Sequence, residues 1–339
     1  MGQVTLLNRV SVLSLRLIVP ILLVVVAGCS DSGRHQKQYR VGILSGMKYL
    51  ADTADSFRDQ MKTLGYVDGK SISYDIRYTD FDMAVYQRVL KKFVAERVDL
   101  IFVYPTEASM EAKAAAKDTG IPVVFSIANV EDTDLVESIR SPGKDITGVR
   151  YPGPDIAVKR LEIMRRLAPE ARRFLIPYQK GYPIVASQLE ALQTQMRAEG
   201  LDMIEAPASD GKELEAALET LSQSDPRPVD AILFLAEPLT VNRDAFRVMG
   251  KFATVHRIPI GGALISVDGY ESLFGLNVKD DSVGKQAAFL ADKILKGTPA
   301  GSIPVVSAEP YFQLNYRAAK AQGFTVSEGL LSTAHDIIK

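Results

Sequence analysis

Polar and aromatic residues stand at the ends of several predicted strands, where they could orient a small molecule. In the first half of the chain the candidate ligand-binding residues are Ser45, Gly46, Tyr49, Tyr104, Thr106, Glu107, Ser126 and Asn129. In the second half they are Tyr178, Gln179, Tyr182, Glu237 and Ser266. Hydroxyl and amide groups bind the polar part of a ligand, and aromatic rings cover its apolar part. This combination predicts binding of a small polar or zwitterionic molecule.

Charged residues near the same strand ends could hold the two ends of a zwitterion. Lys48 or Lys180 could pair with a carboxylate, and Glu107 or Glu237 with an ammonium group. Charged helical faces, such as the one that carries Lys159 and Arg160, are expected to be solvated surface.

The residues that common catalytic mechanisms require are absent from the sequence. Nucleophilic catalysis of the Ser-His-Asp or Cys-His type needs a histidine base. The histidines are His35 and His335, near the two chain ends, and His256 at a predicted helix end. No two of them have metal-ligand spacing, and the single cysteine, Cys29, cannot build a cysteine-based zinc site. We therefore predict a protein that is not an enzyme and that uses no cofactor or metal.

Length and charge bound the remaining possibilities. The chain has 339 residues, enough for two domains of typical size. Its 40 basic and 41 acidic residues give a net charge of -1, so the sequence shows no electrostatic signal for nucleic acid.

The N-terminus has the order of a secretory signal. Arg9 and Arg16 precede an apolar run, and the uncharged stretch between Arg16 and Asp31 has 14 residues, too few for a transmembrane helix. The sequence 26–29, Val-Ala-Gly-Cys, resembles a bacterial lipobox, which implies lipidation of Cys29. We expect residues 1–29 to be the signal peptide with its lipobox and residues 30–37 to be a tether. The mature protein would then lie on the periplasmic or cell-surface side of a membrane, anchored through the lipidated Cys29.

Beyond the tether, short apolar runs alternate with amphipathic helical runs. Strands are predicted at 40–45, 72–78, 100–103 and 122–125, and helices at 54–64, 83–94 and 108–118. After a turn-rich crossing at 141–154 the pattern restarts, with strands at 173–176, 202–205 and 231–235, and helices at 155–167, 184–199, 212–222 and 241–256. This alternation predicts an α/β fold of two Rossmann-like lobes with parallel sheets. Later strands and helices, including helices at 282–296 and 316–322, are too few for a third domain and should complete the two lobes.

Six segments in order resemble substrate-binding proteins of ABC transporters, in the family often labelled tryptophan/tyrosine transport binding proteins. They are residues 98–101, 120–126, 146–149, 229–232, 258–262 and 291–297. The resemblance implies the type I periplasmic-binding fold, in which a three-segment hinge joins the lobes. We place lobe 1 at 38–148 plus 278–305 and lobe 2 at 149–277 plus 306–330. Candidate hinge residues are Gly148, Tyr151, Gly275 and Tyr311, although Tyr151 and Tyr311 could line the cleft instead.

The resemblance also implies a function. A monomeric clamp would capture an amino acid-like solute by hinge closure and deliver it to an ABC permease in the inner membrane. Sensing is the alternative, in which the bound form is presented to a membrane receptor kinase. The sequence departs from relatives that take aromatic amino acids at 178–181 and 237–240, where amide-bearing residues are lost.

Overall fold

The computed structural model describes residues 37–80, 82–131, 133–225 and 227–339, apart from the side chain of Tyr49. The predicted signal peptide, the lipidation site at Cys29 and residues 30–36 of the predicted tether lie outside the described residues. Residues 37–339 form one compact unit. None of the helices in this part of the chain is long and apolar enough to cross a membrane.

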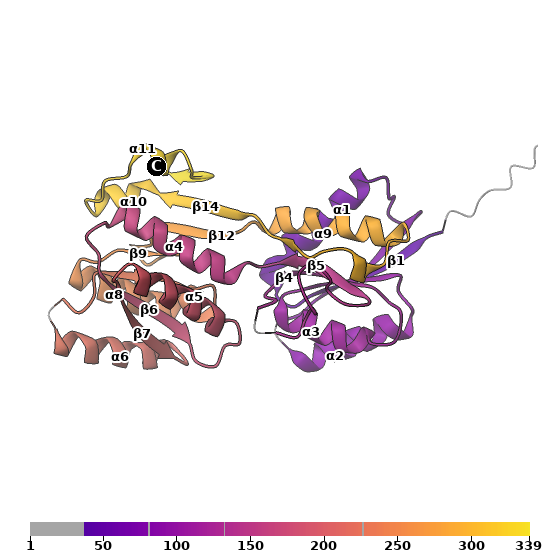
Figure 1. Cartoon of the computed structure of the whole chain (residues 1–339), viewed down its shortest axis with the longest axis horizontal. Coiled ribbons are helices and arrows are strands. Elements are labelled where there is room, and N and C mark those ends of the chain that lie inside the picture. The colour runs from indigo at the N-terminus through magenta and orange to yellow at the C-terminus, as the bar shows by residue number, and fades with distance from the viewer. Residues whose placement is uncertain (1–36, 81, 132, 226) are drawn as a thin grey trace, which may run out of the picture. The chain divides into compact units, whose positions relative to one another are not determined.

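The first sheet has six strands in the order β13-β5-β4-β3-β1-β2. Three of them, β1, β4 and β5, are labelled in Figure 1. Its strands are β1 (Tyr39–Ser45), β2 (Ile72–Tyr78), β3 (Leu100–Tyr104), β4 (Val123–Ala128), β5 (Ile146–Arg150) and β13 (Val306–Ser307). All neighbouring strands are parallel. Because β1 lies between β2 and β3, the strand order reverses there, and ligands of open α/β sheets bind beyond the carboxyl ends of strands at such a point.

The second sheet has four parallel strands in the order β7-β6-β8-β9. They are β6 (Arg173–Gln179), β7 (Asp202–Ala208), β8 (Ala231–Leu233) and β9 (Ile260–Gly261). A bridge between Gly262 and Gly275 continues this sheet into a smaller one of β12 (Phe274–Val278), β14 (Pro310–Asn315) and β15 (Asp336–Ile338). A short hairpin of β10 (Ser266–Val267) and β11 (Tyr270–Glu271) lies between β9 and β12 in the chain.

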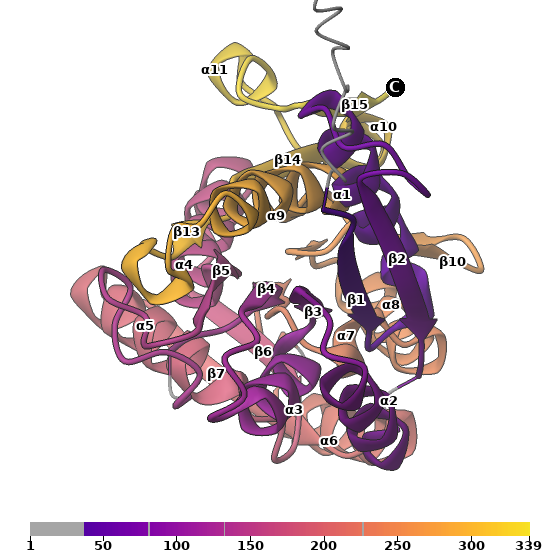
Figure 2. The ribbon, with the colours of Figure 1, turned by 90° about the vertical axis from the view of Figure 1, so that its right-hand side faces the viewer.

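Helices cover both faces of each large sheet. Around the first sheet these are α1 (Ala51–Thr63), α2 (Met83–Ala95), α3 (Thr106–Ala116) and α9 (Asp280–Leu295). α1 and α9 pack side by side, although they are far apart in the sequence (Figure 2). Around the second sheet are α4 (Gly153–Leu167), α5 (Val185–Ala198), α6 (Gly211–Ser224), α7 (Pro238–Val241) and α8 (Arg243–His256). The chain ends with α10 (Tyr316–Ala321), α11 (Glu328–Leu331) and β15.

The residues of β3 show why the first sheet is covered on both faces. All five are buried, and successive side chains point to opposite faces of a strand. Leu100, Phe102 and Tyr104 join the core beneath α1 and α9, whereas Ile101 and Val103 join the core beneath α2 and α3. Burial of each large apolar side chain stabilises the fold by about 1.5–3 kcal/mol.

In the described part of the chain, three connections run between the first sheet and the second half of the fold. They lead from β5 into α4, from β12 into α9, and from β13 into β14. Two candidate hinge glycines have packing roles close to these connections. A Cβ atom on Gly148 would lie 2.3 Å from the carbonyl oxygen of Phe125, and one on Gly275 would lie 2.5 Å from the amide nitrogen of Leu264. Tyr311 lies in β14, with its ring centroid 5.0 Å from that of His335.

Most of the predicted strands and helices are confirmed within a few residues, but several loop assignments are wrong. β4 continues through Ser126, and β6 continues through Tyr178 and Gln179, so these residues lie inside strands. Thr106 and Glu107 form the first turn of α3 rather than a loop. The short elements α7, α11 and β15 were not expected. Each adds only three or four residues, too few to show a hydrophobic period.

Gly148→Ala should destabilise the protein by about 2 kcal/mol or more, because the added methyl group collides with backbone and with the buried ring of Phe125. Urea unfolding would measure the change. Gly329→Ala is the matched control, since its methyl group would meet only Arg166 Nη2 at 3.5 Å. Equal stability of the two variants would contradict the packing described for β5.

Candidate ligand-binding site

A cavity of about 470 Å³ lies at the carboxyl ends of both parallel sheets. Its volume falls within the range of small-molecule sites, and its position is the one where open α/β sheets bind ligands. The first-sheet side contributes Met47, Leu50, Pro105, Thr106, Ile127, Asn129 and Tyr151, and the other side contributes Arg160, Tyr182, Ile184, Leu235, Ala236, Glu237, Pro238, Val241 and Ala263. The connection from β12 into α9 supplies Asn277, Val278 and Asp280.

Asn129 and Tyr151 bring buried polar atoms to the cavity. The backbone N–H of Asn129 donates to Thr106 Oγ1 at 3.1 Å, which ties the end of β4 to the start of α3. Asn129 Oδ1 and the Tyr151 hydroxyl have no hydrogen-bond partner among the described residues. The side chains are only 2% and 5% exposed, so the fold leaves both atoms without compensation from protein or bulk solvent. A buried polar atom of this kind destabilises the fold unless a ligand or an ordered water supplies the missing hydrogen bond.

Glu237 holds the loop on the opposite side in place. Its carboxylate caps α7 by accepting the backbone N–H groups of Leu239 at 2.8 Å and Thr240 at 2.7 Å. It also accepts the N–H of Gln179 at 3.0 Å, which joins this loop to β6. Gln188 fixes the preceding residue, Ala236, through both its backbone N–H and its carbonyl. Glu237 therefore stabilises the loop, and most of its hydrogen-bonding capacity is already used.

The expectation that Arg160 lies on solvated surface was wrong. Its side chain is 1% exposed rather than solvated. Nε and Nη2 donate to the carbonyl of Leu276 at 3.0 and 2.7 Å, and Nη1 donates to the carbonyl of Phe234 at 3.0 Å. No carboxylate pairs with it among the described residues, and burial lowers its pKa. The pattern of α4 contained the signal, because Arg160 lies four residues after Ile156 and four before Met164, on the buried face.

Asp280 is the second charged residue that sequence reasoning missed. It is the first residue of α9 and lines the cavity without a hydrogen bond or ion pair to any described residue. Burial, followed by the nearby charges of Asp52 and Asp281, raises its pKa to about 6. The rule that selects residues just after strands would have found it, because Asp280 follows β12 by two positions.

Four of the predicted ligand-binding residues line the cavity: Thr106, Asn129, Tyr182 and Glu237. The candidate hinge residue Tyr151 lines it as well. The other predicted ligand-binding residues with described side chains lie outside the cavity lining: Ser45, Gly46, Tyr104, Glu107, Ser126, Tyr178, Gln179 and Ser266. The side chain of Tyr49 is outside the described part.

The residues outside the lining have identifiable surroundings. Ser45, Tyr104 and Ser126 are fully buried in their strands, and the Tyr104 hydroxyl and Ser126 Oγ have no partner among the described residues. Tyr178 donates its hydroxyl to Glu205 at 2.6 Å on the neighbouring strand β7. Ser266 is exposed in the β10–β11 hairpin.

The predicted lysine partners for a carboxylate do not line the cavity either. Lys180 pairs with Glu213 at the surface, and Lys48 lies 3.7 Å from Asp80 with both side chains exposed. Long solvated side chains of this kind contribute little binding free energy when paired at a surface. Glu107 has one buried oxygen, Oε2, without a partner among the described residues, but it also lies outside the lining.

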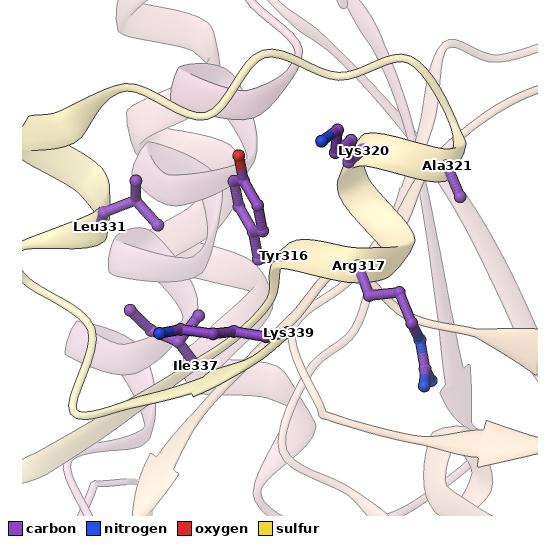
Figure 3. A pocket seen from close by; sticks show the side chains of 7 residues that line it. All are labelled: Tyr316, Arg317, Lys320, Ala321, Leu331, Ile337 and Lys339. Carbon is purple, nitrogen blue, oxygen red and sulfur yellow. The ribbon is translucent and has the colours of Figure 1, made fainter.

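A second hollow of about 680 Å³ lies near the C-terminus and is lined by residues of α10, α11 and the last strand (Figure 3). Tyr316, Leu331 and Ile337 give it an apolar wall, with Lys320 and Lys339 at its border. It lies away from the carboxyl ends of the large sheets. None of its described lining residues carries a buried polar atom without a partner. Its chemistry is therefore less suited to a small polar ligand than that of the cavity between Asn129 and Arg160.

A family model for ABC transporter substrate binding proteins matches residues 43–338. The chain belongs to this family. This substrate-binding protein is 26% identical to a tyrosine-binding protein from Clostridioides difficile over 281 residues, 81% of this chain and 77% of that protein.

Solved structures agree on the fold. One is the ABC domain from Streptococcus pneumoniae in complex with L-Trp, with a TM-score of 0.73, 20% identity, and coverage of 89% of this chain and all of the other. Another is a ligand-free, open structure of a substrate-binding protein with adhesive properties from Clostridium difficile. Its TM-score is 0.71 at 21% identity, covering 89% of this chain and 99% of the other. The substrate-binding protein therefore has the two-lobed type I periplasmic-binding fold.

Asp280→Asn should stabilise the ligand-free protein at pH 7.5. The raised pKa means that folding disfavours the ionised carboxylate, so the destabilisation contributed by Asp280 is absent below about pH 4 and develops as the pH rises through about 6. A shift of about two pH units corresponds to about 3 kcal/mol, which partial exposure reduces to about 1–2 kcal/mol. Thermal unfolding between pH 4 and 8 would measure it. Asp281→Asn is the comparison variant and should give a smaller gain, because Asp281 repels Asp280 but is itself paired with Lys285 at 3.3 Å. A larger gain for Asp281→Asn would contradict the role given to Asp280.

Proposed function

We propose that the protein is the extracytoplasmic solute-binding subunit of an ABC importer and that it captures a small amino acid-like ligand in the cavity. The observation that carries the proposal is the position of the cavity at the carboxyl ends of both sheets, with Asn129 Oδ1 and the Tyr151 hydroxyl left without described partners. Buried polar atoms at a ligand-sized cavity are what recognition of a polar solute requires. Membership of the family supports the transport role.

An aromatic amino acid is the ligand that the relatives favour. One is named a tyrosine-binding protein and another was crystallised with L-Trp. The cavity offers apolar walls for a ring from residues such as Met47, Leu50 and Val278. Its volume of about 470 Å³ is large enough for a molecule of this class.

Capture proceeds by closure of the two lobes around the ligand. The connections from β5 into α4, from β12 into α9 and from β13 into β14 are short, so rotation between the lobes needs to change only a few backbone angles. Tyr151 lies on the first of these connections and also lines the cavity. The closed form is what a permease in the inner membrane recognises.

Attachment to the membrane occurs through lipids on Cys29, which follows the lipobox-like Val-Ala-Gly. Several acyl chains are needed for stable attachment, because one alone binds only marginally. Residues 30–37 then link the anchor to the first strand. The soluble clamp would act on the periplasmic or cell-surface side of the membrane as a monomer.

Thermal unfolding of residues 30–339 against a panel of amino acids, sugars, purines and carboxylates tests the proposal. A ligand at a hundred times its dissociation constant should stabilise the protein by about 2.7 kcal/mol, which raises the melting temperature by several degrees. We expect L-tyrosine or L-tryptophan to give the largest shift. Asn129→Ala should reduce it, whereas Lys320→Ala, at the C-terminal hollow, should leave it unchanged. A folded protein that responds to no solute would contradict the proposed function.

Replacing Cys29 should release the protein from the membrane. In cells that express the full chain, Cys29→Ser should not incorporate labelled palmitate, and the protein should move from the detergent-rich to the aqueous phase of a Triton X-114 extract. Cys29 is the only cysteine, so lipid joined to a cysteine sulfur of the wild-type protein can lie only at this position. Unchanged partition of the variant would refute the anchor.

A further inference from the structure

We infer that the cavity binds its ligand by two opposite charges, with Asp280 holding an ammonium group and Arg160 holding a carboxylate. The inference rests on the proposed function and assigns the residues that select a zwitterion. Neither residue was expected from the sequence to touch a ligand, and both line the same cavity.

The Asp280 carboxylate lies among acidic residues and has no cationic partner among the described residues. It forms no ion pair or hydrogen bond with them, whereas Asp281 and Asp292 of the same helix both pair with lysines. Its charged neighbours Asp52 and Asp281 are both acidic, which makes a positive group at this point still more favourable. Lys279 precedes it in the chain but lies 3.8 Å from Asp281 instead.

Arg160 has the complementary property. Its guanidinium group has five N–H donors, and three hydrogen bonds to carbonyl oxygens leave two of them without an acceptor among the described residues. Carbonyl groups supply only partial charges. Glu237 is near enough to raise the pKa of Arg160, but its carboxylate is occupied by the backbone N–H groups of Gln179, Leu239 and Thr240, so it offers the guanidinium no hydrogen bond. A ligand carboxylate is the group that offers both the missing acceptors and the missing charge.

Two further polar atoms of the residues that line this cavity fit the same ligand. Asn129 Oδ1 is an acceptor without a described partner and suits a second N–H of an ammonium group. The Tyr151 hydroxyl, also without a described partner, can donate to a carboxylate. Both residues are more than nine-tenths buried. The proposed site therefore includes two fixed, buried polar groups in addition to the carboxylate at the start of α9.

The two charges belong to opposite lobes. α9 packs on α1, β4 and β5 of the first sheet, whereas α4 packs on α5, β8 and β12. A zwitterion held at both ends would therefore connect the lobes, and its binding would favour the closed form. A ligand with only one charge would leave the other residue uncompensated in a poorly solvated cavity, which gives selectivity for the zwitterion.

Ligand analogues that each lack one charge test the inference against the wild-type protein. Isothermal titration calorimetry would compare L-tryptophan with indole-3-propionate, which lacks the amine, and with tryptamine, which lacks the carboxylate. We expect each analogue to bind at least 30-fold more weakly than L-tryptophan. If another amino acid gives the largest thermal shift, its deaminated and decarboxylated analogues take these places.

Variants then assign the charges to residues. Asp280→Asn should weaken the binding of L-tryptophan and of tryptamine by at least 30-fold and leave that of indole-3-propionate unchanged. Asp281→Asn removes only a neighbouring charge, so it should weaken the binding of the two amines clearly less than Asp280→Asn does and leave that of indole-3-propionate unchanged. Arg160→Lys should weaken the binding of L-tryptophan and of indole-3-propionate and leave the binding of tryptamine unchanged. If that variant does not fold, the comparison of tryptamine with L-tryptophan on the wild-type protein still tests the carboxylate side.

Each result has a distinct meaning. Equal binding of all three ligands to the wild type, or equal losses for all three on Asp280→Asn, would overturn the charge assignment while the proposed function stands. A sugar or purine that stabilises the protein when no amino acid does would also overturn the inference and leave solute binding intact. Absence of any ligand would remove the proposed function and this inference together.

Discussion

A buried arginine holds together the part of the fold on which the cavity depends. Arg160 on α4 donates to the carbonyl of Leu276 in β12 and to the carbonyl of Phe234 just after β8. These bonds join the helix to the second sheet and to the strand that leads toward α9. Because the guanidinium is only 1% exposed, the fold must keep all three acceptors in place to offset the loss of hydration. The same constraint fixes a positive charge at the wall of the cavity.

The architecture follows from constraints that act locally in the sequence. Strands buried on both faces read as continuous apolar runs, as in residues 100–104, and helices carry apolar residues at a period of 3.6. Both signals are visible without tertiary information, so the alternating α/β order and two parallel sheets could be predicted. The pairing of β14 with β12 and with β15 could not, because it joins segments up to about forty residues apart through short strands.

The candidate site was only partly predictable for a physical reason. The rule for parallel sheets indicates the edge at which a ligand binds but not the residue at which each strand ends. When a strand is one or two residues longer than predicted, a residue expected in the following loop lies inside the strand instead. Ser126 and Gln179 were expected in loops for this reason but lie inside β4 and β6. Arg160 was missed because a charged residue on a helix is normally solvated, and only its spacing from Ile156 and Met164 indicates the buried face. Asp280 follows β12 by only two positions, but an acidic residue in the first turn of a helix is normally solvated, so the sequence does not indicate that it lines a cavity.

The central claim is that a small solute binds between the two sheets, and a crystal structure of residues 30–339 with the most stabilising amino acid tests it most directly. We expect electron density for the ligand in the cavity lined by Asn129 and Tyr151, with the amine within hydrogen-bond distance of Asp280 and the carboxylate within hydrogen-bond distance of Arg160. Density at the C-terminal hollow beside Tyr316, with the cavity filled by water alone, would contradict it.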